Sequence, residues 1–376
     1  MQIITNTLDT YTYHELADIL HSYNNTAAVS DFLFFDIETT GFSARNSMCY
    51  LIGCVSLNNE NFIIKQFFAD NPSDCDDEKK MLTEFMHFAS GFKYIVHFNG
   101  DVFDIPYLKE KCRQYNMLYH FDLLTGYDLY KEACRFKKLF QTPDLKQKTL
   151  ETFLGSARKD EFSGKELINV YYAYEKEHKD SDKELLLLHN FEDVKGLTEL
   201  LRLYTYSAAC SKNIRFEHYI LRNYKSYDGT MQKELVIRFL LPAPVPTPVS
   251  QVNDFSLLTF IGDIGTLSIK VRSGELKFFY PDYKNYYYLP KEDCAMHKSV
   301  AFYVDKNFRT QAKAANCYSK KTGCFLPEYE EVFSPYFKAE YQDKILYFEA
   351  EDAFFADSAN LQKYLLHIIP EITCVF

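Results

Sequence analysis

Apolar and polar residues follow two different periods along the first half of the chain. Short apolar runs separated by polar breaks lie at residues 32–38, 48–57 and 62–68. Runs of this length and spacing are typical of strands, so we expect three adjacent antiparallel strands. Residues 81–90 then place apolar side chains at helical spacing behind an acidic start, and a strand-like run at 94–100 precedes a helical pattern at 103–115. Alternation of strands and helices favours an α/β sheet.

The pattern changes twice further along the chain. After about Tyr119 it becomes mostly helical, and residues 181–204 form a long amphipathic stretch. Prolines alternate in LLPAPVPTPVS at residues 240–250, which predicts an extended, unpaired segment. Strand-like runs follow at 256–262, 266–271, 275–281, 285–290 and 299–305, before a closing helix at 357–369. We therefore expect a smaller second domain that is α+β or mostly β.

These patterns divide the chain into three parts. Residues 1–30 are expected to form an N-terminal helical extension, with 14–21 as its most periodic part. Residues 31–207 should form the α/β domain, and residues 208–376 a C-terminal domain that binds substrate or a partner.

Composition narrows the class of protein. The 376 residues are 47% hydrophobic and 25% charged, which is typical of a globular protein. No apolar run approaches the roughly 20 residues that span a bilayer, and the N-terminus has no basic head before an apolar run. The ten cysteines form no CxxC pair, which favours reduced thiols and a cytoplasmic location. The net charge of −10 excludes bulk attraction to nucleic acid but not a local grip through metal ions.

The first apolar run ends in a pair of carboxylates. In FLFFDIETTGF, Asp36 and Glu38 share one side of the strand while Phe35 and Ile37 share the other. Buried carboxylates lose hydration and need partners or a metal ion. The pair therefore either binds a metal ion at the end of the strand or lies at the start of a loop without a function.

Two later segments carry matching chemistry. HFNGDVFDIPYL contains Asn99 and Asp104, and LHNFEDVKGL contains His189 and Asp193 one helical turn apart. Hydrolysis of a phosphodiester is assisted by two divalent cations about 4 Å apart, and Mg²⁺ prefers hard oxygen ligands. An imidazole near neutrality can take a proton from the attacking water. Each motif alone has an ordinary structural interpretation; the conjunction of all three favours a nuclease.

The three motifs resemble those of the DEDD (DnaQ-like) exonuclease superfamily, which has a ribonuclease H-like fold. They are DIETTG, N-x-x-x-FD at Asn99–Asp104 and H-x-x-x-D at His189–Asp193, and the resemblance covers about residues 31–205. FFDIETTG, HFNGxxFDxPYL and HNFEDV resemble the YprB-like group of that superfamily. The three-residue spacing after His189 is usual for the tyrosine branch and fits the YprB-like group. His189 is thus either the base or a residue that positions water.

The resemblance implies a ribonuclease H-like mixed sheet flanked by helices and two bound cations, Mg²⁺ or Mn²⁺. Asp36 would bridge both cations, Glu38 and Asp193 would complete one, and Asp104 would hold the other. Thr39, Gly41 and Phe42 would touch the terminal nucleotide, and Asn99 would lie near the scissile end or fix the loop around Asp104. The activity implied is 3′→5′ exonucleolytic cleavage of DNA or RNA with a free 3′ end, in nucleic-acid repair or processing.

Basic residues give further candidates for substrate contact. Residues 306–321 contain five basic and no acidic side chains, and we assign Lys320 and Lys321 to nucleic-acid binding. The alternative is a solvated strand-turn face. Lys146, Lys148 and Arg158 are weaker candidates. Two other functions stay open: a structure-selective endonuclease on the same fold, and a non-catalytic nucleic-acid-binding module. A helicase is a candidate partner of the second domain, and no membrane partner is expected.

Overall fold

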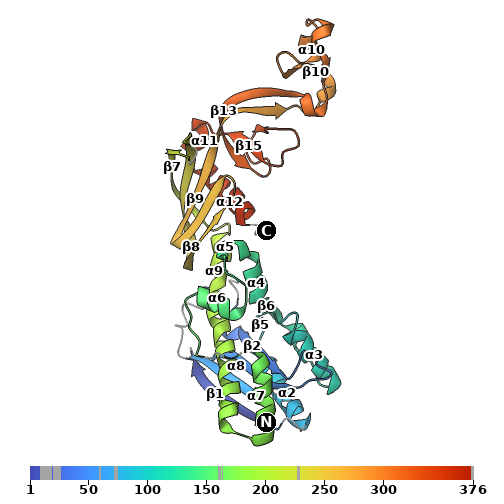
Figure 1. Ribbon diagram of the computed structural model, residues 1–376, viewed down its shortest axis with the longest axis vertical. Helices are drawn as coiled ribbons and strands as arrows, with labels where there is room; N and C mark the ends of the chain where they lie inside the picture. The colour runs from blue at the N-terminus through green and yellow to red at the C-terminus, as the bar shows by residue number, and fades with distance from the viewer. Residues whose placement is uncertain are drawn as a thin grey trace. The chain divides into compact units, whose positions relative to one another are not determined.

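The computed structural model describes residues 1–8, 19, 27–58, 61–71, 75–159, 162, 164–226 and 229–373 (Figure 1). The chain divides into two compact units. The first comprises Met1–Ala208 with Val245–Thr247, and the second comprises Ala209–Pro244 and Pro248–Phe376.

A mixed six-stranded sheet forms the centre of the first unit. Its order is β1-β4-β3-β2-β5-β6, with β2 antiparallel to β3 and parallel to β5. The strands are β1 (Gln2–Leu8), β2 (Phe32–Thr39), β3 (Cys49–Asn58), β4 (Asn61–Phe68), β5 (Tyr94–His97) and β6 (Thr125–Asp128). The predicted mixed sheet with flanking helices is confirmed.

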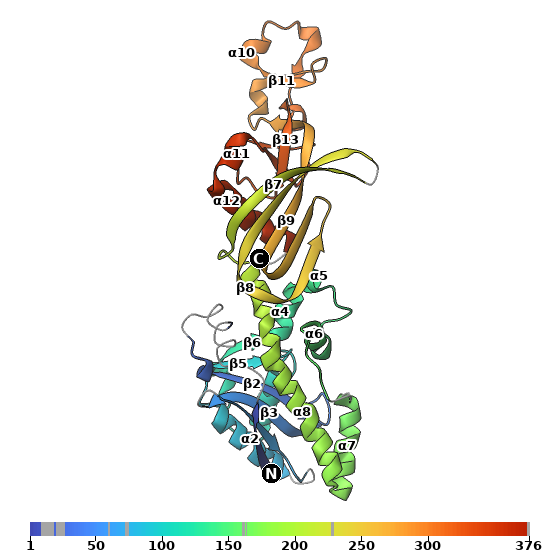
Figure 2. The same ribbon diagram turned by 90° about the vertical axis from the view of Figure 1, so that its left-hand side faces the viewer.

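Helices cover both faces of this sheet (Figure 2). Phe35 and Ile37 of β2 point to the face that packs on α2 (Cys75–Ala89) and α3 (Asp104–Gln114). Asp36 and Glu38 alternate to the opposite face, where α7 (Gly164–Glu177) and α8 (Asp180–Leu200) lie. Four short helices complete the unit: α4 (Leu129–Arg135), α5 (Lys137–Phe140), α6 (Gln147–Phe153) and α9 (Tyr204–Ala209).

Two predictions for the first unit were wrong in part. Residues 2–8 form strand β1 rather than a helical extension, because QIITNTL is rich in β-branched residues and pairs with the edge of β4. Apart from Ile19, the helix expected around residues 14–21 lies outside the described residues. The short strand β6 lies in the part that was expected to be mostly helical, since four residues are too few to show a period.

The second unit is built on another six-stranded sheet, in the order β14-β15-β13-β9-β8-β7. Its strands are β7 (Arg215–Lys225), β8 (Met231–Val252), β9 (Ser256–Phe279), β13 (Tyr318–Glu328), β14 (Tyr336–Phe337) and β15 (Leu346–Glu349). The helices α11 (Asp352–Ala356) and α12 (Ser358–Thr373) follow. A small sheet, β11-β10-β12, contains β10 (Tyr286–Leu289), β11 (Cys294–His297) and β12 (Thr310–Gln311).

Three predictions for this unit need correction. The three strand-like runs between 256 and 281 form one continuous strand, β9. The strand expected at 299–305 is instead helix α10 (Lys298–Ala301) and a turn. The alternating prolines lie within β8, next to β9 in the sheet order, rather than in an unpaired segment.

The prolines fit a strand because of their spacing. Alternate residues of a strand direct their N–H groups to the same edge, so prolines at 242, 244, 246 and 248 remove donors from one edge only. Pairing of β8 with β7 ends at Leu240, before the first of them.

No described helix combines the length and the apolar character that a bilayer crossing requires.

Candidate active site

Strand β2 carries the first two carboxylates to the face beneath α8. Asp36 lies opposite Gly53 of β3 in the sheet register. A Cβ atom on Gly53 would lie 2.1 Å from Asn190 Oδ1, so only glycine lets α8 approach the sheet this closely. Asn190 uses the approach to donate its Nδ2 to Asp36 Oδ2 at 3.4 Å. Gln66 Nε2 donates to Asn190 Oδ1 at 3.0 Å and thereby sets the orientation of the amide.

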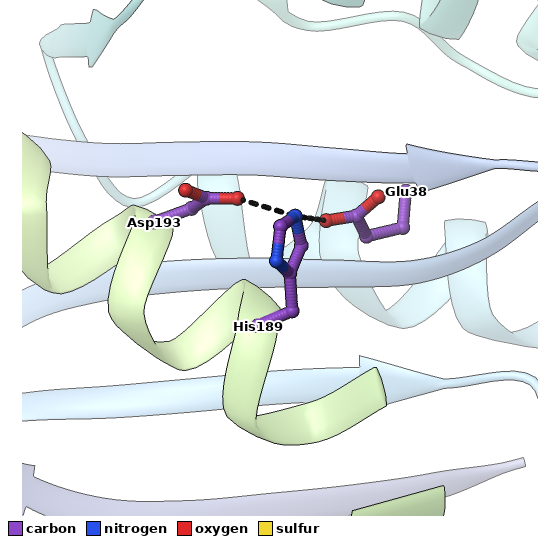
Figure 3. Close-up of side chains that lie close together, drawn as sticks. All are labelled: Glu38, His189 and Asp193. Atoms are coloured by element: carbon purple, nitrogen blue, oxygen red, sulfur yellow. Dashed lines mark ion pairs between the residues drawn. The ribbon is translucent and has the colours of Figure 1, made fainter. Parts of the chain in front are cut away.

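Helix α8 brings a histidine and a third carboxylate to the same place (Figure 3). His189 and Asp193 are one turn apart, and His189 Nε2 lies 3.2 Å from Asp193 Oδ2. The same Nε2 lies 3.7 Å from Glu38 Oε1 on β2. The imidazole is buried and its Nε2 lies between carboxylates from two separate elements.

The fourth carboxylate enters at the start of α3. Asp104 is buried, and its carboxylate accepts a hydrogen bond from the backbone N–H of Ile37 in β2. Burial is the main cause that raises the pKa of Asp104 to about 7, and the charge of Asp128 raises it further. The hydrogen bond to Ile37 ties the second motif to the strand that carries the first.

The electrostatics of Asp36 show that the acidic groups converge. Burial raises the pKa of Asp36 well above its usual value, and the charges of Asp193, Glu38 and Asp104 raise it further in that order. Arg158 acts in the opposite direction. Crowded, buried carboxylates are unfavourable unless a cation compensates them. The donor set consists of hard oxygens with one imidazole beside it, which fits Mg²⁺ or Mn²⁺.

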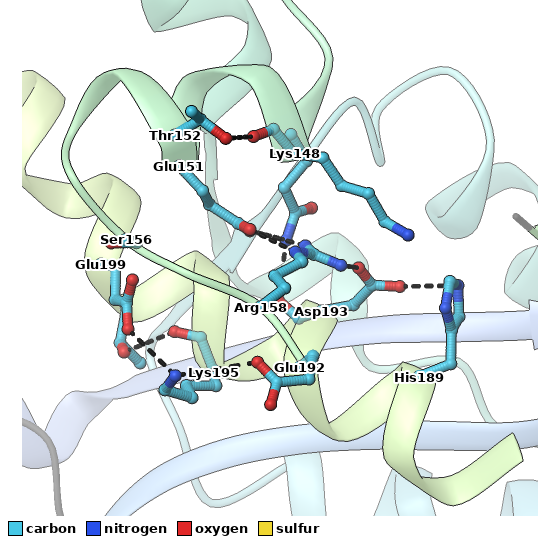
Figure 4. Close-up of polar contacts among 12 residues, drawn as sticks. Lys148, Glu151, Thr152, Ser156, Arg158, His189, Glu192, Asp193, Lys195 and Glu199 are labelled. Atoms are coloured by element: carbon cyan, nitrogen blue, oxygen red, sulfur yellow. Dashed lines mark hydrogen bonds and ion pairs between the residues drawn. The ribbon is translucent and has the colours of Figure 1, made fainter. Parts of the chain in front are cut away.

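An arginine anchors Asp193 from outside the acidic group (Figure 4). Arg158 Nη1 donates to Asp193 Oδ1 at 2.5 Å, and its Nη2 donates to Glu151 Oε1 at 2.6 Å. Gln147 Nε2 donates to the backbone carbonyl oxygen of Asp193 at 2.8 Å. Gly196 of α8 makes room for the carboxylate of Glu151, because a Cβ atom at this position would lie 1.9 Å from Glu151 Oε1.

Sequence reasoning gave Arg158 only a weak role in gripping the backbone, and it passed over Glu151, Asn190 and Gly53. Arg158 is instead mostly buried in an ion pair. Neither Gly53 nor Asn190 stands in a recognisable motif, so no signal in the single sequence could have found them. Glu192 is also buried, and its carboxylate lies 3.7 Å from Lys195 Nζ.

The turn after β2 contains the residues predicted to touch the terminal nucleotide. Thr39 Oγ1 and Ser47 Oγ each donate to the carbonyl oxygen of Gly41 at 2.9 Å, which fixes the turn. Phe42 is 93% exposed, and its ring centroid lies 5.9 Å from that of Phe103. An aromatic ring held at the end of an ordered turn is available for stacking on a base.

Asn99 lies in the left-handed region, with φ 59°, and its backbone N–H donates to Asp128 Oδ1 at 2.9 Å. Asp128 also caps α4 by accepting from the backbone N–H of Tyr130. His97 lies behind this turn. Its Nδ1 accepts from the Gly100 N–H at 3.1 Å, which leaves the ring proton on Nε2, facing Asp101 Oδ1 at 3.5 Å. The cluster of His97, Asp101 and Asp128 therefore supports the loop that leads to Asp104 rather than offering a metal ligand.

Lys320 and Lys321 lie in the second unit, and each lies between two carboxylates. Lys320 Nζ is 2.6 Å from Asp293 Oδ2 and 3.3 Å from Glu275 Oε1. Lys321 pairs with Glu349, and Glu351 Oε1 lies 3.5 Å away. A phosphate would have to compete with these carboxylates, so nucleic-acid binding by the two lysines stays a prediction.

A comparison with protein families places the domain. Residues 33–205 match the family model described as the RNase H superfamily. The match confirms the predicted ribonuclease H-like fold of this segment. The match runs from β2 to α9 and thus contains Asp36, Glu38, Asp104, His189 and Asp193. Membership of the YprB-like group stays a prediction.

Solved structures similar to this chain include E. coli exonuclease I in complex with a dT13 oligonucleotide, at 13% identity and a TM-score of 0.31. The alignment covers 57% of this chain and 55% of exonuclease I, so it spans little more than half of that protein. A zinc-bound complex of E. coli exonuclease I with single-stranded DNA gives 13% identity, a TM-score of 0.30 and the same coverage. No curated protein matches the chain.

Cation binding can be tested without any activity. We expect Mn²⁺ or Mg²⁺ to raise the Tm of the wild-type ribonuclease H superfamily domain within the full chain, since the cation relieves repulsion among the carboxylates. Asp36→Asn should abolish this shift. Asp122→Asn, which removes an exposed carboxylate outside the group, should keep it. Equal shifts in wild type and Asp36→Asn, measured by differential scanning fluorimetry after EDTA treatment, would contradict the site.

The raised pKa of Asp104 predicts a pH-dependent stability in EDTA. Between its ordinary value near 4 and about 7, folded Asp104 binds more protons than the unfolded chain. The free energy of unfolding should therefore fall as pH rises through this window. Asp104→Asn should weaken the dependence, whereas Asp122→Asn, at an exposed position, should not. Urea unfolding at pH 4.5, 6 and 7.5 measures the difference, and identical slopes for both variants would exclude Asp104 as its source.

Proposed function

We propose that this protein is a metal-dependent 3′→5′ exonuclease that trims DNA or RNA from a free 3′ end. The observation that carries the proposal is the convergence of Asp36, Glu38, Asp104 and Asp193 with His189 beneath α8. The ribonuclease H superfamily match supports nuclease chemistry over the same residues. The direction of cleavage and the DEDD assignment rest on the resemblance of the three motifs.

Each side chain has a distinct part in this proposal. Asp36 would hold two cations. Glu38 and Asp193 would complete the ligands of one cation, and Asp104 would hold the second. When bound, the cations lower the pKa of the attacking water and stabilise negative charge on the leaving oxygen.

His189 Nε2 faces Glu38 and Asp193 and would take the proton of the attacking water. The carboxylate of Asp193 then stabilises the imidazolium that forms, because it lies 3.2 Å from Nε2. Arg158, whose guanidinium also donates to Glu151, holds Asp193 from the other side, so this carboxylate keeps its position while the charge on the histidine changes. If His189 is not the base, it would orient the attacking water. Substitution of His189 tests both roles.

Thr39, Gly41 and Phe42 would bind the terminal nucleotide. The turn is fixed by its own hydrogen bonds, while the ring of Phe42 projects into solvent. A base stacked on Phe42 would be held without regard to its identity, which suits sequence-independent trimming. A helicase partner, a role in repair and a cytoplasmic location stay predictions.

The test is a cleavage assay with 5′-labelled DNA and RNA, single- and double-stranded, in Mg²⁺ or Mn²⁺. We expect a ladder that shortens from the 3′ end, no product in EDTA and none with Asp36→Ala, which removes the bridging carboxylate. Asp122→Ala, at an exposed position, is the matched control and should cleave normally. Retained cleavage by Asp36→Ala would refute the metal assignment. Cleavage of circular single strands would instead favour the endonuclease, and binding without cleavage would favour the non-catalytic module.

Substitution of the histidine separates chemistry from folding. His189→Ala should lower kcat by roughly 10²–10⁴, as expected for a lost general base, with circular dichroism and Tm close to wild type. His87→Ala, at an exposed position on α2, should leave kcat unchanged. An unchanged kcat would assign the histidine another role.

A further inference from the structure

The second unit exposes an unusual set of aromatic rings around α10, in the orange segment near the small sheet (Figure 1). We call the set Lys291, Lys298, Phe302, Tyr303, Phe308 and Arg309 the α10 surface. Phe302 is 71% exposed, Tyr303 is 88% exposed and Phe308 is 45% exposed. Neighbouring exposed rings of this size are costly in water and mark an interaction site more often than chance.

Cations hold or flank these rings. The Arg309 guanidinium donates to the carbonyl oxygen of Ala301 and lies 5.9 Å from the ring centroid of Phe302. Lys291 Nζ lies 4.1 Å from the centre of the Phe308 ring. The rings of Phe302 and Tyr303 are at 87° to each other with centroids 5.8 Å apart, so they present faces in two directions. The surface is therefore ordered before any ligand binds.

The charge around the rings is strongly biased. Residues 298–313 contain four basic side chains and one acidic side chain, Asp305, in a chain of net charge −10. Asp305 accepts from the Asn307 N–H at 2.8 Å as the cap of a short turn. Among the described residues, no carboxylate forms an ion pair with Lys298, Lys306 or Arg309. This contrasts with Lys320 and Lys321, whose charges are compensated.

We propose that the α10 surface binds single-stranded nucleic acid without sequence preference, with bases stacked on Phe302 and Tyr303 and phosphates on Lys298 and on two lysines of the same basic stretch, Lys306 and Lys313. Stacking requires ring faces that duplex bases do not offer, which selects single strands. A protein partner fits less well, because lysine is depleted at the cores of protein interfaces. The choice of nucleic acid as ligand rests on the proposed function, but binding here requires none of the catalytic carboxylates.

The test is fluorescence anisotropy with labelled dT20 and U20 on full-length chain carrying Asp36→Asn, in EDTA, so that cleavage is absent. Phe302→Ala with Tyr303→Ala should weaken binding by about tenfold or more, as loss of stacked rings does. The matched control, Leu257→Ala with Ile261→Ala, removes exposed apolar side chains of the same unit and should leave the affinity unchanged.

The charge component has its own control. Lys306→Gln with Lys313→Gln should reduce the slope of log K against log salt by about 1.4, near 0.7 per phosphate contact on single strands. Lys270→Gln with Lys344→Gln makes the same change in net charge and should reduce the slope much less.

Unchanged affinity in the aromatic variant, or no binding to either oligonucleotide, would overturn the inference and leave the rings to a protein partner. Failure of the proposed function would give a different result. The wild-type chain would then not cleave in Mn²⁺, while the aromatic and lysine variants would still bind the oligonucleotides more weakly than wild type. Conversely, normal wild-type cleavage with unaltered binding by the variants would refute only the α10 surface.

Discussion

Mutual repulsion among buried carboxylates is the constraint on which the first unit depends. Asp36, Glu38, Asp104 and Asp193 come from β2, α3 and α8, and the charges of the other three raise the cost of ionising Asp36. Such a group persists only if the surrounding structure holds it in place. The fold does so with neutral and cationic partners: the amide of Asn190, the backbone N–H of Ile37 and the guanidinium of Arg158.

Two glycines make this arrangement sterically possible. Gly53 lets the middle of α8 lie against β3, and Gly196, further along the same helix, admits the carboxylate of Glu151. The helix is thus fitted to the sheet on one side and to α6 on the other, with Asp193 between the two contacts. The position of α8 therefore determines which charged groups meet, because moving the helix outward would separate His189 and Asp193 from Glu38.

The sequence predicted the parts whose signal is local. The alternation in FLFFDIE placed Asp36 and Glu38 on one face, and helical spacing placed His189 beside Asp193, as the structure shows. Partners distant in sequence could not be found this way. Arg158 lies 35 residues from Asp193, and Asn190 lies 154 residues from Asp36. Tertiary context also overrode local propensity at residues 299–305, where apolar, β-prone residues form α10 and leave Phe302 and Tyr303 in solvent. The C-terminal runs merged into β9 because a sheet can extend a strand through residues that look like turns.

The alternating prolines of β8 have a consequence beyond their own strand. A sheet margin with free amide hydrogens is a template on which another polypeptide can add, and such addition begins many aggregates. Beyond the part of β8 that pairs with β7, four ring nitrogens at alternate positions remove the donors from one edge of the strand. This limits the hydrogen-bond ladder that any neighbouring polypeptide can form along the edge that the ring nitrogens face.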